Sequence, residues 1–245
     1  MDEDETSAGA LLGGRVSYRQ FRAGHRSGFE PVLMAALLSA RAGERVLEAG
    51  TGAGAALLCL AARVPGVQGV GVERGAALAG LAARNIAANG FAGLAVVNAD
   101  ATALPFAAQT FQHVMANPPW FGTHNTASPD TARALAHHAP AATLAAWVGE
   151  MLRVLRDKGS ITLALPASAY AEAAALLRLT CGGILLLPLW PRRGVKAKMI
   201  LLQAQKASRA PDEILPGLVL HDETGITKEA EAVLREGAGL KAADR

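Results

Sequence analysis

The chain has 245 residues, of which 51% are hydrophobic and 18% are charged. This composition excludes an intrinsically disordered chain, and the length fits one large α/β domain or a domain with a small appendage. The formal net charge is +3 although four of the first five residues are acidic, so the rest of the chain is distinctly basic. The basic surplus is compatible with an RNA partner, and equally with ordinary solvated lysines and arginines.

Targeting and redox signals are absent from the sequence. No run of about 18 apolar residues is free of Gly, Pro and charge, as a membrane span requires. The acidic amino terminus is the reverse of a signal peptide, so we expect a cytoplasmic protein that does not contact a membrane. Cys59 and Cys181 belong to no Cys-x-x-Cys or Cys/His pattern, so we expect reduced cysteines near the core and no metal site. The sequence leaves the oligomeric state unknown.

Helical and extended patterns alternate along the chain. A helix is expected first, over 28–40, and a short helix last, over 228–236. Between them, short apolar runs predict strands, and stretches with apolar residues three and four positions apart predict helices. The predicted strands are 45–49, 69–73, 95–99, 113–116, 160–165, 184–189 and 197–205, and the predicted helices between them are 53–63, 76–89, 143–155 and 168–180.

This alternation determines the expected fold. Strands that alternate with helices form right-handed crossovers, which give a mostly parallel sheet with helices on both faces. The first four strand runs hardly alternate in polarity, as expected for strands covered on both faces. The last two runs have a short connection and predict one antiparallel strand. We therefore expect an α/β fold with a seven-stranded sheet, in a single domain over 1–245 that consists of an N-terminal arm (1–23), a core (24–206) and a C-terminal extension (207–245).

A glycine-rich turn follows the first predicted strand. Glu48 ends the strand, and Gly50, Thr51, Gly52 and Gly54 come before the helix. Glycines allow the backbone to turn sharply and to approach a ligand closely. The spacing differs from the G-x-G-x-x-G of dinucleotide-binding turns, and a carboxylate here would repel a pyrophosphate. The turn therefore favours a cationic ligand such as S-adenosylmethionine, held by Glu48 directly or through water; a tight packing turn is the alternative.

Acidic residues also follow the next two predicted strands. Glu73, with Arg74 beside it, ends the second strand, where an acid commonly accepts both hydroxyls of a ribose. The alternative is an acid that interacts with the dipole of the following helix. Asp100 follows the third strand and could accept a hydrogen bond from an adenine amine, while the N–H of Ala101 donates to a ring nitrogen. The alternative for Asp100 is a helix or turn cap.

The tetrapeptide Asn117, Pro118, Pro119 and Trp120 follows the fourth predicted strand. Prolines have no N–H and a fixed φ, so they leave carbonyl groups that a strand ladder does not use. The Asn side chain adds an acceptor, and the Trp adds a flat aromatic face. These groups predict a site that holds a planar amine or amide by its N–H groups. All four motifs lie at carboxyl ends of parallel strands, which meet at one edge of the sheet.

On these motifs the chain resembles class I S-adenosylmethionine-dependent methyltransferases with a Rossmann-like fold, over residues 24–205. The Asn-Pro-Pro-aromatic tetrapeptide is typical of members that methylate amino or amide nitrogens conjugated to a π-system. The chain further resembles the bacterial tRNA-valine adenine-37 N6-methyltransferase family, on residues 24–30 with 32–35, 128–130 with 136–138, 191–194 with 197–198, and 220–223 with 225. It departs from its relatives in having Glu48 and Glu30 where Asp is common, and Trp120 where Tyr or Phe is commoner.

The resemblance implies a function and a set of site residues. The cofactor would be S-adenosylmethionine, and the substrate an exocyclic amino group of a nucleobase, first of all adenine N6 in tRNA. Catalysis would involve the tetrapeptide. The implied cofactor residues are His25, Arg26, Glu48, Gly50, Thr51, Gly52, Gly54, Glu73, Arg74, Asp100, Ala101 and Asn117. His137 and His138 are expected to lie at the surface or to cap a helix, and Trp147 and Trp190 to be packing residues.

Other functions remain open at this point. The same chemistry could act on guanine N2 of ribosomal RNA or on a protein glutamine amide. A methyltransferase-like fold could also serve only as an RNA-binding module, although the intact acidic residues and tetrapeptide argue against that. A nicotinamide oxidoreductase is the most distant alternative, because the glycine spacing is wrong for it.

Overall fold

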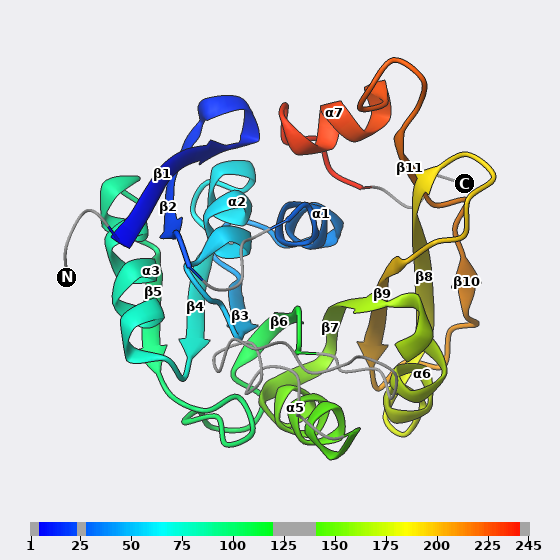
Figure 1. The fold of residues 1–245 in the computed structure, drawn as a ribbon. Helices are drawn as coiled ribbons and strands as arrows, with labels where there is room; N and C mark the ends of the chain where they lie inside the picture. The colour runs from blue at the N-terminus through cyan, green and yellow to red at the C-terminus, as the bar shows by residue number, and fades with distance from the viewer. Residues whose placement is uncertain (1–4, 24–27, 120–140, 241–245) are drawn as a thin grey trace.

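The structure is a computed structural model that describes residues 5–23, 28–119 and 141–240 (Figure 1). It contains one large mixed sheet, covered by helices on both faces, and a separate two-stranded hairpin. Within the described ranges, no helix is long and apolar enough to cross a membrane.

The large sheet has nine strands in the order β10-β8-β9-β7-β6-β3-β4-β5, with β11 also paired to β8. β9 runs antiparallel to its neighbours β7 and β8, and the other pairs are parallel. The strands are β3 (Arg45–Ala49), β4 (Gln68–Glu73), β5 (Leu94–Asn98), β6 (Phe111–Ala116), β7 (Leu155–Pro166), β8 (Cys181–Arg192), β9 (Met199–Lys206), β10 (Glu213–Ile214) and β11 (Leu218–His221).

The predicted fold class is confirmed. All seven predicted strands form, and β9 is the antiparallel strand that the short connection indicated. The two additional strands, β10 and β11, have 2 and 4 residues and lie in the predicted C-terminal extension. β10 has too few residues to show a periodicity, and β11 lies in a segment for which only the C-terminal helix was predicted.

Two helical layers cover the two faces of the sheet. Adjacent residues of a strand point to opposite faces, and in β3 Val46 packs into one hydrophobic cluster and Leu47 into the other. The cluster with Val46 includes α1, α2, α3 and α7, whereas that with Leu47 includes α5 and α6. The helices are α1 (Glu30–Leu37), α2 (Ala55–Arg63), α3 (Ala76–Ala88), α5 (Ala141–Val154), α6 (Tyr170–Arg178) and α7 (Lys228–Leu234).

The predicted N-terminal arm contains a β-hairpin that the sequence analysis did not anticipate. β1 (Thr6–Leu11) pairs antiparallel with β2 (Val16–Phe21), and Leu12, Gly13 and Gly14 between them have positive φ angles that reverse the chain. Two buried β2 residues, Val16 and Tyr18, belong to the same cluster as α2 and α3. The hairpin is therefore packed on the helical layer beside the sheet (Figure 1).

Helix boundaries differ modestly from the expected ones. The helix expected over 28–40 begins at Glu30, with Pro31 in its first turn, and ends at Leu37, because Leu38 is extended with ψ 128°. The helix predicted to end near Asn89 ends at Ala88, and Gly90 has the expected left-handed φ of 68°. The helix expected over 168–180 is shorter, because residues Ala167–Ala169 form a 3₁₀ turn ahead of α6.

Candidate functional site at the carboxyl edge of the sheet

The register of the central strands brings the sequence motifs to one edge. Ala49, at the end of β3, lies opposite Val72 on β4 and opposite Ala116 on β6. The glycine turn therefore begins beside Asn117, since each motif starts one residue beyond a paired position. Farther along the edge, Glu73 at the end of β4 lies opposite Asn98 at the end of β5.

The glycine turn folds back onto the end of β4. The N–H groups of Gly50 and Thr51 donate to the carbonyl oxygen of Val72, at 2.8 and 3.0 Å. Gly50, Gly52 and Gly54 have φ angles of 70°, 57° and 90°, a region that other residues rarely adopt. The turn thus requires glycine for its conformation, and it presents backbone at the edge of the sheet.

Glu48 lies beneath this turn. Its side chain is 4% exposed, and its Oε2 accepts hydrogen bonds from Thr51 Oγ1 at 2.7 Å and from Leu57 N at 3.3 Å. Burial raises the pKa of the carboxyl to about 8, and the two hydrogen bonds only partly oppose that effect. The observed contacts show a structural role for Glu48 in the turn, whereas its contact with a cationic ligand stays a prediction.

Glu73 joins the glycine turn to the start of α3. Its Oε2 accepts from Gly52 N at 3.0 Å, and its Oε1 accepts from Gly75 N at 2.8 Å. Asn98, which the sequence analysis did not include in the site, donates from Nδ2 to the carbonyl oxygens of Glu73 and Arg74, at 2.7 and 3.0 Å. The half-buried carboxylate is thus held in position by backbone groups, and a carboxylate can accept additional hydrogen bonds.

Asp100 forms the local turn that the sequence analysis named as its alternative role. Its Oδ1 accepts from Thr102 N at 2.8 Å and from Thr102 Oγ1 at 2.7 Å. These hydrogen bonds, the backbone one first, lower the pKa of the Asp100 carboxyl, so it is ionised at neutral pH. The side chain is exposed at the sheet edge, and Ala101 beside it is buried. A turn role and a ligand role are compatible here, because only one carboxylate oxygen is used in the turn.

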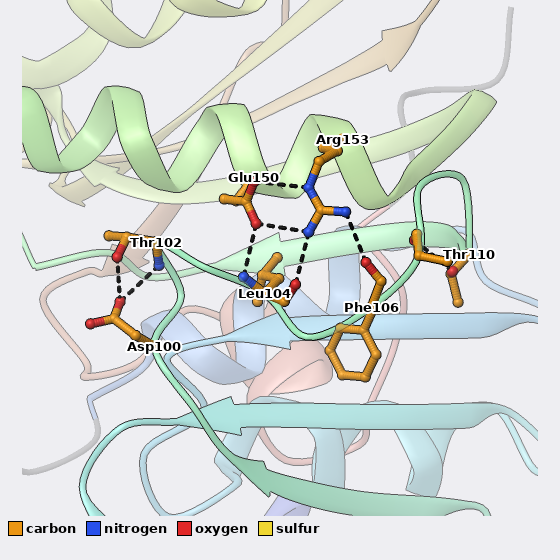
Figure 2. A network of polar contacts seen from close by, with 8 residues as sticks. Asp100, Thr102, Leu104, Phe106, Thr110, Glu150 and Arg153 are labelled. Atoms are coloured by element: carbon orange, nitrogen blue, oxygen red, sulfur yellow. Dashed lines mark hydrogen bonds and ion pairs between the residues drawn. The ribbon is translucent and has the colours of Figure 1, made fainter.

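A polar network on α5 holds the segment after Asp100 (Figure 2). Glu150 accepts from the N–H of Leu104 at 2.8 Å, and Arg153 donates to the carbonyl oxygens of Leu104 and Phe106, each at 2.8 Å. Arg153 also makes an ion pair with Glu150 at 2.8 Å. No local sequence pattern indicates this pair, because the carbonyl and N–H groups that it binds are 46 to 49 residues away in the chain.

Trp147 of α5 packs against the turn itself. A Cβ atom added to Gly50 would lie 2.6 Å from Trp147 Cη2, so the indole is in close contact with the Gly50 backbone. Trp147 was expected to be a packing residue, and it packs at the carboxyl edge of the sheet, against the glycine turn. Trp190, which was also expected to be a packing residue, is half-buried in β8, and its Nε1 donates to the carbonyl oxygen of Pro216 at 3.1 Å.

The tetrapeptide is described in part. Asn117 is half-buried, Pro118 is buried and Pro119 is exposed, directly after β6. The other predicted residues, Trp120, His25, Arg26, His137 and His138, lie outside the described residues. Over the described part of the chain, no group of three or more His, Cys, Asp and Glu side chains could hold a metal ion.

Comparison with known proteins gives a family match and a curated relative. A family model described as a methyltransferase domain matches residues 40–186, which include the glycine turn and the ends of β3 to β7. A protein of Tolumonas auensis described as tRNA1(Val) (adenine(37)-N6)-methyltransferase is 28% identical over 233 residues, which are 92% of this chain and 91% of that protein.

Solved structures share the fold. A predicted O-methyltransferase from Agrobacterium tumefaciens has a TM-score of 0.73 at 23% identity, covering 88% of this chain and 99% of that one. The P. horikoshii protein TYW2, solved in complex with MeSAdo, has a TM-score of 0.59 at 13% identity, covering 85% of this chain and 74% of that one. At these identities the likeness is one of architecture.

The contact with Trp147 distinguishes two glycines of the turn. Alanine at Gly52, where nothing lies within 4 Å of the added Cβ, should cost only the left-handed conformation, about 1 kcal/mol. Gly50→Ala should cost about 1–3 kcal/mol more, because its Cβ also collides with the indole. Urea unfolding measures both values, and equal losses for the two variants would show that the indole is not held against Gly50.

Burial of Glu48 predicts a pH-dependent stability. The folded protein keeps the Glu48 proton up to a pKa of about 8, whereas the unfolded chain loses it near 4.5. Between these values the wild type should lose about 1.4 kcal/mol of unfolding free energy per pH unit relative to Glu48→Gln, which keeps an acceptor for Thr51 and Leu57. Urea unfolding of both proteins from pH 5 to 9 tests this. Parallel pH profiles would mean that the carboxyl is ionised in the folded state.

Proposed function

The chain belongs to the methyltransferase-domain family, and from that premise we propose that it methylates an exocyclic amino group of a nucleobase, N6 of adenine in a tRNA, with S-adenosylmethionine as the methyl donor. One observation carries the proposal. The pairing of Ala49 with Ala116 sets the glycine turn and Asn117 side by side, so a donor bound at the first can reach an acceptor bound at the second. The name of the curated relative supports a tRNA substrate of the same kind.

The residues at the edge fit the donor. When bound, S-adenosylmethionine supplies a methyl group that its sulfonium activates. The Glu73 carboxylate would accept hydrogen bonds from the ribose hydroxyls, because Gly52 and Gly75 use only part of its capacity. Asp100 would accept from the adenine amine with its second oxygen, and the N–H of Ala101 would donate to the ring. The proposed cofactor site also includes Thr51, Arg74, His25 and Arg26.

The acceptor side follows from the chemistry of the amine. The lone pair of an exocyclic amine is delocalised into the ring, so the nitrogen is a poor nucleophile. The side-chain oxygen of Asn117 and the carbonyl oxygen of Pro118 would accept hydrogen bonds from its two N–H groups, which favours the positive charge that develops on the nitrogen as the new bond forms. Trp120 would stack on the base, with Pro119 shaping the turn. No strong base is required, since the methylated nitrogen is acidic and its proton can pass to water.

Basic residues on the same edge support an RNA substrate. β8 runs in the same direction as β7, so the loop between β8 and β9 lies at the edge that holds the site. Arg192 at the end of β8 is exposed, and so are Arg193, Lys196 and Lys198 in the loop. Arg192 donates to the carbonyl oxygen of Asp222 at 2.8 Å, which secures one end of the loop. Such a cluster suits the phosphates of a folded RNA whose target base must be turned out of its stack.

The decisive experiment compares acceptors. The purified protein is incubated with S-adenosylmethionine and total tRNA, ribosomal RNA or translation factors, and the digested products are analysed by mass spectrometry. We expect N6-methyladenosine in tRNA. Methyl groups found only in ribosomal guanine or in protein glutamine would replace the proposed acceptor by one of the alternatives. An absence of cofactor binding in calorimetry would favour a non-catalytic RNA-binding role.

Asn117 is expected to act on turnover rather than on cofactor binding. Asn117→Ala should lower kcat at least about 100-fold, because one of the acceptors for the amine protons is lost. The dissociation constant for S-adenosylmethionine, measured by calorimetry, should stay within a few-fold. A suitable control is Gln112→Ala at the opposite end of β6, where the side chain accepts from Arg45 N at 3.0 Å. Normal turnover in Asn117→Ala would remove the residue from the mechanism.

The loop between β8 and β9 is expected to act on RNA binding. Arg193→Glu combined with Lys196→Glu should raise KM for tRNA at least about 10-fold and reduce the salt dependence of binding by about two phosphate contacts. The matched control is Lys158→Glu with Arg209→Glu, two exposed residues near the opposite edge of the sheet. Equal effects of the two pairs on KM would indicate a general charge effect and contradict a specific RNA contact of the loop.

A further inference from the structure

The side chain of Asn85 connects three segments that are distant in the sequence. It lies on α3, is 3% exposed, and uses both ends of its amide. Its Oδ1 accepts from Arg19 N at 3.0 Å, while its Nδ2 donates to Arg19 O and to Ala53 O, each at 2.9 Å. Arg19 belongs to β2 of the N-terminal hairpin, and Ala53 lies in the glycine turn between Gly52 and Gly54.

A second asparagine, just after the last residue of α3, binds the hairpin in the same way but does not reach the turn. Asn89, one helical turn later, accepts from Ser17 N at 2.9 Å and donates to Ser17 O at 2.7 Å. Ser17 and Arg19 are alternate residues of β2, so their backbone groups point to the same edge of the strand. The two asparagines therefore cover the edge of the hairpin, but only Asn85 also reaches the turn.

Because the Asn85 side chain is buried, loss of its hydrogen bonds would cost free energy. A buried backbone group that loses its partner costs about 1–3 kcal/mol, and removal of the Asn85 amide would leave Ala53 O without the bond that orients it. Gly52 on one side of Ala53 donates to Glu73, and Gly54 on the other donates to the carbonyl oxygen of Thr51. A rotation of the Ala53 peptide would therefore disturb the groups around the Glu73 carboxylate.

We propose that Asn85 is a positioning residue that uses the N-terminal hairpin to hold the glycine turn in the conformation that binds the cofactor. The inference rests on the proposed function, because the turn is its cofactor site. Asn85 itself is buried behind the turn and acts through Ala53 rather than by touching the donor. The hairpin thereby becomes part of the cofactor site without contributing a ligand.

The test separates cofactor affinity from turnover. Asn85→Ala should raise Kd and KM for S-adenosylmethionine about 10-fold or more, while kcat at saturating cofactor stays within about twofold, since the methyl acceptor groups are untouched. Asn89→Ala is the matched control: it removes the hydrogen bonds to Ser17 of the hairpin but leaves those of Asn85 to Arg19 and Ala53, so its Kd should equal that of the wild type. Equal Kd values for the two variants would overturn the proposal.

A measurement on the wild type covers the case in which Asn85→Ala does not fold. Hydrogen–deuterium exchange with and without S-adenosylmethionine should show protection of both the turn (residues 50–54) and β2, because the amide of Asn85 links them. Protection confined to the turn would also overturn the proposal. A wild-type protein that does not bind the cofactor at all would instead contradict the proposed function, so the two failures are distinguishable.

Discussion

The site depends on the parallel pairing of β3 with β4 on one side and β6 on the other. This pairing sets Ala49 between Val72 and Ala116, so that the segments after three strands begin at the same height. Val46 and Leu47 fill opposite hydrophobic clusters, and a slip of one residue would exchange their faces. The core therefore specifies the register, and the register in turn specifies which polar residues meet at the edge.

The acidic residues at this edge are held in position by the protein's own donors. Glu73 accepts from two backbone N–H groups, Asp100 from a backbone and a hydroxyl group, and Glu48 from a hydroxyl and a backbone group beneath the turn. Groups that are ordered before a ligand arrives lose less freedom on binding. Hydrogen bonds from neighbouring elements hold the surrounding backbone. Asn85, which also binds the hairpin, bonds to the turn, and Glu150 and Arg153 of α5 bond to the segment after Asp100.

Membership of a methyltransferase family does not identify the atom that is methylated. The fold neighbour from Agrobacterium tumefaciens is described as an O-methyltransferase, whereas the curated relative acts on an adenine nitrogen by its name. The methylated atom has to be argued from the site itself, here from the side chains after β6 and from the surface around them. For this chain the proposed acceptor rests on Asn117 and Pro118, and the proposed RNA on the basic loop between β8 and β9.

The sequence by itself determined the alternation of strands and helices, the family resemblance and the presence of chemical groups at strand ends; the β3 prediction, 45–49, even matches the observed bounds. These features are local, because hydrophobic period and turn residues report on neighbouring positions. Only the tertiary structure decided that Glu48 is buried with a raised pKa, that Trp147 packs on Gly50, and that a hairpin reaches the turn through Asn85. Each of these depends on a contact between segments far apart in the chain, which no local pattern encodes.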